Sequence, residues 1–150
     1  MGISASDVAK YLISHFCAQK QPISNLKLQK LLYYCQGWHL GLTRRPLFPD
    51  SIEAWVHGPV VPSVFREYRE YQWSPIAKSG EAPQLPARTT DVIDSVVAAY
   101  GNFSAAQLEQ LSHQETPWLR TRGDLPPDCS SRSEITHDRM AGFFGDLANG

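Results

Sequence analysis

Metal binding is the first chemistry that the side chains of this sequence could support. The residues that could act as ligands are His39, His57, His113, His137, Glu53 and Glu115. Zinc sites use such side chains at short, regular spacings, as in the HExxH motif or a His-x-x-His pair. Only His113 and Glu115 are close in sequence, and side chains two positions apart diverge on a helix. We therefore expect no metal site, and separate structural or surface roles for these histidines.

Cys35 and His39 could form a nucleophilic pair, because residues four positions apart share a helix face. A catalytic thiol needs an exposed, electropositive setting that lowers its pKa, whereas Cys35 falls within an apolar stripe. The chain also has no Gly-rich elbow for an oxyanion hole and neither of the phosphate-binding signatures GxxxxGK[ST] and GxGxxG. We predict a protein that is not an enzyme and needs no cofactor, with a Cys/His enzyme as the alternative.

Four basic residues could together contact nucleic acid, namely Lys27, Lys30, Arg44 and Arg45. Glu53, Asp50 and Glu67 are interspersed in the same region, and the formal net charge of the chain is −1. Domains that bind phosphate backbones usually carry a clustered basic patch. The sequence therefore favours a solvated helix face and a loop over a nucleic-acid interface.

Aromatic side chains are the stronger functional signal. Trp, Tyr and Arg dominate the hot spots of protein interfaces, and this chain has more large aromatic residues in its first half than a small core easily accommodates. Trp38 and Trp55 lie on apolar faces, so we expect them in the core. The residues that we expect to contact a partner protein are Tyr33, Arg66, Arg69, Tyr71 and Trp73.

The composition predicts one folded domain spanning residues 1–150. Hydrophobic residues make up 42% and charged residues 19% of a chain of 150 residues, which is enough for one ordinary core. The N-terminus lacks a signal peptide, about 18 apolar residues never run together, and the three cysteines have no CxxC spacing. We therefore expect a cytoplasmic protein without membrane contact.

Two capped helices open the chain. Ser4 or Ser6 can cap the first, which we expect to run to about Gln19, and Ser24 can cap the second. The second helix carries an apolar stripe over four turns, formed by Leu28, Leu31, Leu32, Cys35, Trp38, His39 and Leu42. Lys27, Lys30 and Gln36 fall largely off this stripe. Gly37 predicts either a close neighbour or a bend at that point of the helix.

A short β-hairpin is expected after the second helix. The segment Ile52 to Val56 alternates as a strand does, and Pro46-Leu47-Phe48 is the candidate for its partner. Gly58-Pro59 predicts a sharp corner, and Pro62 suits the first turn of a third helix. The inner side of that helix is marked by Val64, Phe65, Tyr68 and Tyr71.

The remaining chain predicts a long loop and further helices. Residues 72–88 are rich in Pro, Ser, Gly and Ala and are typical of a surface connection. Caps or stops then occur at Thr90, Gly101, Ser104 with Gln107, Thr116-Pro117 and Ser133. The last helix would present Ile135, Met140, Phe143, Phe144 and Leu147. The predicted fold is mainly α: a compact helical bundle of about six helices, with the hairpin inserted between the second and third.

The order of motifs from Asn25 to Ile76 resembles that of a known family. The segments LKLQKLLYY, QGWHL, RPLF, IEAW and HGPVVPSVFREY resemble the Panacea antitoxin domain of SocA-like and GepA-like phage-associated proteins. The motif residues to which we assign a structural role are Trp38, His39, Trp55, Gly58, Pro59 and Pro62. The loop from Gly80 to Arg88 differs from the family pattern, and Cys35 stands where alanine is usual.

The resemblance implies a binding protein. Members of this family neutralise partner toxins by direct contact, so the expected partner is a cognate protein toxin, encoded by the adjacent gene. Some members also deliver the toxin to a protease, which makes a cellular protease a further expected partner. The alternative from another class is a prophage-encoded transcription regulator.

Overall fold

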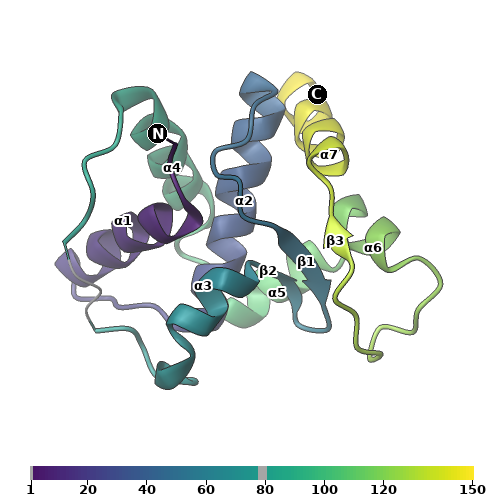
Figure 1. Ribbon diagram of the computed structural model, residues 1–150, viewed down its shortest axis with the longest axis horizontal. Helices are drawn as coiled ribbons and strands as arrows, with labels where there is room; N and C mark the ends of the chain where they lie inside the picture. The colour runs from purple at the N-terminus through teal and green to yellow at the C-terminus, as the bar shows by residue number, and fades with distance from the viewer. Residues whose placement is uncertain (1, 78–80) are drawn as a thin grey trace.

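The computed structural model describes residues 2–77 and 81–150, and these fold as a mainly α-helical protein, which confirms the predicted fold class. In Figure 1 the long helix α2 stands at the centre, with the other elements arranged around it. The elements of the described residues, in chain order, are α1 Ala5–Ala18, α2 Asn25–Thr43, β1 Ile52–Trp55, β2 Gly58–Val60, α3 Pro62–Glu67, the 3₁₀ helix η1 Arg69–Tyr71, α4 Ala87–Tyr100, α5 Ala105–Ser112, α6 Thr116–Arg122, β3 Glu134–Ile135 and α7 His137–Asn149.

Side-chain caps fix the starts of several helices where the sequence predicted them. Ser4 caps α1, its side chain accepting from the backbone N–H of Asp7 while the Asp7 carboxylate accepts from the N–H of Ser4. Ser24 caps α2, and Ser104 with Gln107 forms the expected capping box of α5. Pro62 occupies the first turn of α3, and Gly101 ends α4. Each serine cap satisfies a backbone donor that the start of the helix would otherwise leave unpaired.

Helix α2 is buried around most of its circumference, including Lys30 and Gln36, which fall off its apolar stripe; this corrects the solvated helix face expected for Lys30. Both are fully buried, as is Gln29. The amide of Gln36 accepts from the backbone N–H of Leu47 (2.7 Å) and donates to the carbonyl of Phe48 (2.7 Å). The amide oxygen of Gln29 accepts from the N–H of Val61 (2.9 Å). These polar side chains hold the segments that wrap around α2, and each has a hydrogen-bond partner inside the protein.

Helix α7 approaches α2 closely at Gly37 and Gly41. The sequence left open whether Gly37 marks a close neighbour or a bend in the helix. A Cβ atom at Gly37 would lie 2.2 Å from the ring of Phe144, and one at Gly41 would lie 2.7 Å from the Phe144 backbone carbonyl carbon. The absence of side chains at both positions lets the two helices pack backbone against backbone. The close neighbour, rather than a bend, accounts for the glycine.

The sheet has three antiparallel strands in the order β2-β1-β3, and its pairing corrects the predicted hairpin. The partner of β1 is β2, with Glu53 opposite Val60 and Trp55 opposite Gly58. Residues 46–48 form no strand, because the backbone of Leu47 and Phe48 is already bonded to Gln36. Ile135 pairs with Ile52 from the far end of the sequence, a contact between segments that local pattern does not reveal.

Three other element boundaries differ from the sequence prediction. Helix α4 begins at Ala87, so Thr90 lies inside it, and Pro86 precedes it. The last helix is capped by Thr136 instead of Ser133. Ser133 lies beside the sheet, where its backbone carbonyl accepts a hydrogen bond from the N–H of Ala54 (2.9 Å). The third helix stops at Glu67, and Tyr71 belongs to η1. Of the predicted surface loop from Gln72 to Arg88, residues 78–80, including Gly80, lie outside the described residues.

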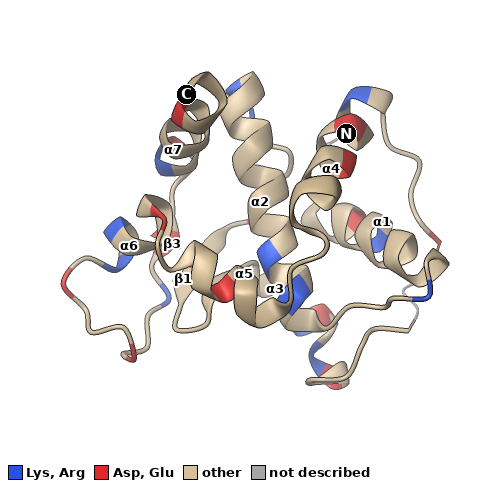
Figure 2. Ribbon diagram, turned by 180° about the vertical axis from the view of Figure 1, so that it is seen from behind, with Lys and Arg blue, Asp and Glu red and all other residues tan. Residues whose placement is uncertain are grey.

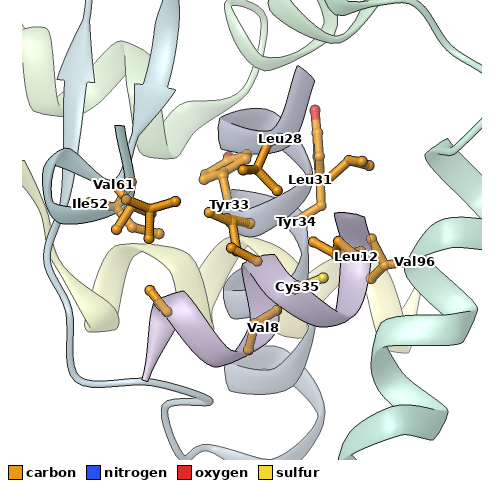
Figure 3. Packing of buried hydrophobic residues seen from close by; sticks show 14 of the residues in the cluster. Val8, Leu12, Leu28, Leu31, Tyr33, Tyr34, Cys35, Ile52, Val61 and Val96 are labelled. Carbon is orange, nitrogen blue, oxygen red and sulfur yellow. The ribbon is translucent and has the colours of Figure 1, made fainter. Parts of the chain in front are cut away.

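The core lies where α1, α2, β1 and α4 meet. Figure 3 shows Leu12 of α1 beside Val96 of α4 and close to Cys35 of α2, and Val8 and Leu31 belong to the same buried cluster. Val8, Leu12 and Phe16, spaced four positions apart on α1, are all buried. Each fully buried side chain of this kind contributes about 1.5 to 3 kcal/mol. Across the described residues, no helix combines the length and apolar character needed to span a membrane.

Candidate functional site

Four of the five expected contact residues lie in one segment at the surface. Arg66 is on α3, Arg69 and Tyr71 are on η1, and Trp73 follows η1. The two arginines are exposed, Tyr71 is half-buried, and Trp73 exposes 73% of its side chain and backbone area to solvent. Gln72, which ends η1 just before Trp73, has a positive φ of +53°. We call these four residues the α3–η1 surface.

Tyr33 is the fifth expected contact residue, and the structure corrects its placement. Its side chain is fully buried, and its ring packs edge to face on Phe144 of α7, with 5.6 Å between ring centroids. Its hydroxyl donates to Oε1 of Glu115 (3.0 Å). The prediction was wrong because α2 is covered on the face that carries Tyr33, so this tyrosine cannot reach a partner without unfolding of its surroundings.

Glu115 is the centre of a buried polar cluster that also contains Tyr33 and Tyr34. The Tyr34 hydroxyl lies 3.2 Å from both carboxylate oxygens of Glu115. Burial raises the pKa of Glu115 to about 7, although the two tyrosine hydroxyls partly oppose this by stabilising the charged form. Burial, followed by the nearby Glu115 charge, also raises the pKa of each tyrosine hydroxyl. The cluster is closed to solvent, and its chemistry is therefore that of a structural network.

Lys30 forms a second buried polar position. Its ammonium group donates to the carbonyl of Pro59 (3.3 Å), and its side chain packs against Gly58, where a Cβ would lie 2.9 Å from Lys30 Cε. Burial lowers the pKa of Lys30 to about 7, with the charge of Glu109 acting in the opposite direction. Gly58 has φ of +104°, a conformation that favours glycine. The Gly58-Pro59 corner is thus shaped to accept the lysine.

The other motif residues, His39, Trp38 and Trp55, make structural contacts at the border of the core. His39 donates from Nδ1 to the carbonyl of Arg45 (2.6 Å), which ties the end of α2 to the following loop. Trp55 is half-buried, its indole N–H donates to Glu53 (2.8 Å), and its ring packs edge to face on Phe65. Trp38 is also half-buried, and its indole N–H donates to the hydroxyl of Tyr100 (2.9 Å). Trp38 and Trp55 therefore lie at the border of the core, whereas the sequence predicted them in the core.

An apolar groove beside Trp38 is a candidate contact site that the sequence did not predict. It has a volume of about 580 Å³ and is formed by α2, α4 and α7, with walls from Trp38, Leu42, Val92, Val96, Ala99 and Ala148. Figure 1 shows α4 and α7 on opposite sides of the upper half of α2. Leu42 is 58% exposed and was predicted as part of the buried stripe. We call this feature the α2–α4–α7 groove. The sequence shows the apolar residues of these helices, but it does not show how the helices are spaced in the fold.

The structure gives no support to the Cys35–His39 pair. The thiol of Cys35 is fully buried, and its pKa is raised by desolvation and then by the charge of Asp94, which keeps it protonated. His39 is engaged with Arg45. A nucleophilic thiol needs the opposite environment. Within residues 2–77 and 81–150, no three His, Cys, Asp or Glu side chains are placed to hold a metal ion.

The four basic residues considered for nucleic acid are not assembled into one patch. Lys30 is buried, and Lys27 donates to the carbonyl of Gly101 (2.6 Å). Arg44 and Arg45 lie at the other end of α2, about 20 Å away along the helix. Figure 2 shows basic and acidic segments interspersed over the ribbon. This geometry favours neither a DNA-binding helix nor a basic stripe.

These features define a class: a mainly helical protein with an exposed tryptophan and an open apolar groove, both suited to contact with another protein. Comparison with known proteins identifies the family. The family model for the antitoxin SocA-like Panacea domain matches residues 28–119. Antitoxin SocA from Caulobacter vibrioides (strain NA1000 / CB15N) is 36% identical over 129 residues, covering 77% of this chain and 69% of that protein. The chain belongs to the SocA-like Panacea antitoxin family. No solved structure matches it.

Proposed function

We propose that this protein is the antitoxin of a toxin–antitoxin pair, and that it neutralises a cognate protein toxin, encoded by the adjacent gene, by direct binding. Membership of the antitoxin family supports the role. The observation that carries direct binding is the α3–η1 surface, where the 73% exposed Trp73 shares a segment with two exposed arginines. Tryptophan and arginine are the residues that most often anchor protein interfaces.

The binding energy required is within reach of such a surface. Neutralisation at nanomolar concentration needs about −12 kcal/mol, which a standard interface burying roughly 1,600 Å² can supply when a few anchors are well desolvated. A large ring such as that of Trp73 gives much contact area for little loss of side-chain entropy. The cytoplasmic location expected from the sequence remains a prediction.

We further propose that residues 1–150 act as one Panacea-like domain. The family match covers residues 28–119, whereas α1 and α7 lie outside it. Both outer helices nevertheless pack on α2, which lies largely inside the match. The elements at the two ends of the chain are therefore part of the same core as the matched segment.

Coexpression with the neighbouring gene tests the proposed function. The adjacent gene is induced in a heterologous bacterium, alone and with this protein tagged, and growth and copurification are recorded together. We expect growth arrest that coexpression relieves, with both proteins eluting as one complex. Relief without a complex would favour delivery to a protease or enzymatic reversal, and a harmless neighbour would remove the proposed partner.

Substitution of Trp73 tests the contact surface. Trp73→Ala should weaken toxin binding by about 2 kcal/mol, roughly 30-fold, because a hot-spot aromatic would be lost. Leu125→Ala, at an apolar residue that is 41% exposed in the loop between α6 and β3, is the control and should leave the dissociation constant unchanged. Equal affinities for the two variants, measured by titration calorimetry, would exclude Trp73 from the interface.

A further inference from the structure

The α2–α4–α7 groove is an apolar surface that the folded chain leaves open. Leu42 lies 58% exposed at its edge, and Ala99 of α4 is also exposed. The groove volume, about 580 Å³, lies within the range of roughly 300 to 1,000 Å³ typical of binding pockets. Exposed apolar surface of this shape in a small protein is typical of an interaction site.

The groove offers almost no hydrogen bonds to an occupant. Its three walls are helices, whose backbone groups are bonded internally, and it has no strand edge. The indole N–H of Trp38 is already bonded to Tyr100, and the hydroxyl of Ser95 donates to the carbonyl of Asp91 (2.8 Å). An extended peptide would lose water from its backbone amides without gaining partners. The occupant must therefore satisfy its own backbone, as an α-helix does.

The charge at the groove specifies a feature of that helix. Asp91 is the one charged side chain among the described residues that line the groove, and it is exposed. No lysine or arginine of the described chain lies within ion-pair distance of it. A carboxylate beside an apolar channel suits a basic residue next to the apolar face of a bound helix.

We propose that the α2–α4–α7 groove binds an amphipathic α-helix of the toxin, which buries apolar side chains at spacings of three and four against Trp38, Leu42 and Ala99 and places a Lys or Arg beside Asp91. The inference rests on the proposed antitoxin function and adds to it the kind of toxin segment recognised. The helix-in-groove arrangement gives affinity through apolar anchors and orientation through the single ion pair.

A pair of neighbouring alanines on α4 tests the groove. Ala99→Arg would fill the groove with a long cationic side chain, whereas Ala98→Arg places the same side chain at an exposed position outside the groove. Arginine is a good helix former, so both variants should keep the fold, which circular dichroism checks. We expect Ala99→Arg to weaken binding of the adjacent-gene product about 30-fold or more, and Ala98→Arg to change it less than about 3-fold.

The outcomes separate this inference from the proposed function. Relief of growth arrest by the unmodified protein supports the antitoxin role, and its failure overturns both. If the unmodified protein rescues growth and Ala99→Arg binds as tightly as Ala98→Arg, the groove inference is wrong while the antitoxin function stands. Asp91→Lys should weaken binding about 10-fold through like-charge contact, against no change for Asp128→Lys in the loop before β3.

Crosslinking identifies the occupant. A photoreactive p-benzoylphenylalanine at Ser95, which lines the groove, is activated in the purified complex with the adjacent-gene product, and the attached peptide is mapped by mass spectrometry. We expect a helical segment of the toxin with apolar spacings of three and four and a basic residue. A crosslink to a second copy of this chain, or to a strand of the toxin, would overturn the inference.

Discussion

Glu115 is a carboxyl group that the fold has removed from water and surrounded with the hydroxyls of Tyr33 and Tyr34. Its folded-state pKa, about 7, lies above the value of 4.5 expected in the unfolded chain. The folded protein therefore binds this proton more tightly. The stability that Glu115 contributes is fully present below pH 4.5 and is lost as the pH rises towards 7.

Glu115→Gln should remove this pH dependence, because the amide cannot ionise and its oxygen can still accept from a tyrosine. We expect the free energy of unfolding of the variant, relative to the wild type, to increase between pH 4.5 and 7 and then to stay level. Urea titrations of both proteins at several pH values in this range provide the measurement. The lowered pKa of His113 affects both proteins alike and cancels in the difference. Glu70→Gln, at an exposed position, controls for the lost charge, and parallel profiles for Glu115→Gln and wild type would contradict the prediction.

At the scale of elements, the packing of α7 on α2 depends on the two glycines of α2. Gly41→Ala should lower the free energy of unfolding by about 1 to 3 kcal/mol, because the new Cβ would lie within 2.8 Å of backbone atoms of Phe144 and Gly145, which cannot rotate away. Gly142→Ala is the matched control on α7. A Cβ there meets nothing within 4 Å, so the change should raise stability by about 0.5 to 1 kcal/mol. Thermal or urea unfolding of both variants checks the opposite signs, and stabilisation by Gly41→Ala would show that the helices can separate at no cost.

The elements that the sequence predicted well are those specified by neighbouring residues. Ser4, Ser24 and Ser104 act on backbone groups three positions away, and their caps are found as expected. Strand β3 and the start of α7 were missed, because both depend on the pairing of Ile52 with Ile135, more than eighty positions apart. No periodicity along the chain encodes such a contact.

The candidate site was predicted less completely for a related reason. Lys30, Gln36 and Tyr33 look like surface or contact residues in sequence, but other elements cover α2 at these positions, so their polar atoms bond inside the protein. Conversely, Leu42 looks like a core residue and is exposed, because α4 and α7 leave the groove open at the end of α2. Burial of a helix face depends on where its neighbours pack, and that is a property of the whole fold.

At the scale of the whole molecule, the core is completed by elements outside the family match. A fragment of residues 28–119 lacks α1, β3 and α7, and with them Val8, Leu12 and Phe144. Loss of each large core side chain costs about 2 to 5 kcal/mol, while small proteins are stable by only about 5 to 15 kcal/mol. We expect the fragment to show reduced helicity and no cooperative thermal transition by circular dichroism, in contrast to the full chain. A sharp transition in the fragment would mean that residues 28–119 form the domain alone.

The two proposed contact surfaces lie in different parts of the molecule, which makes their energies separable. The segment after α3 lies at the lower edge in Figure 1, whereas α4 and α7 flank the upper half of α2. Substitutions that share no neighbours have additive effects on free energy to within about 0.5 kcal/mol.

If both surfaces contact one toxin, the fold-changes in dissociation constant for Trp73→Ala and Ala99→Arg should multiply in the double variant to within a factor of about two. Calorimetric titration of the adjacent-gene product with the wild type, the two single variants and the double variant measures the four dissociation constants. A double variant no weaker than Ala99→Arg alone would show that the toxin occupies the groove without reaching Trp73, and the α3–η1 surface would then be free for a different partner.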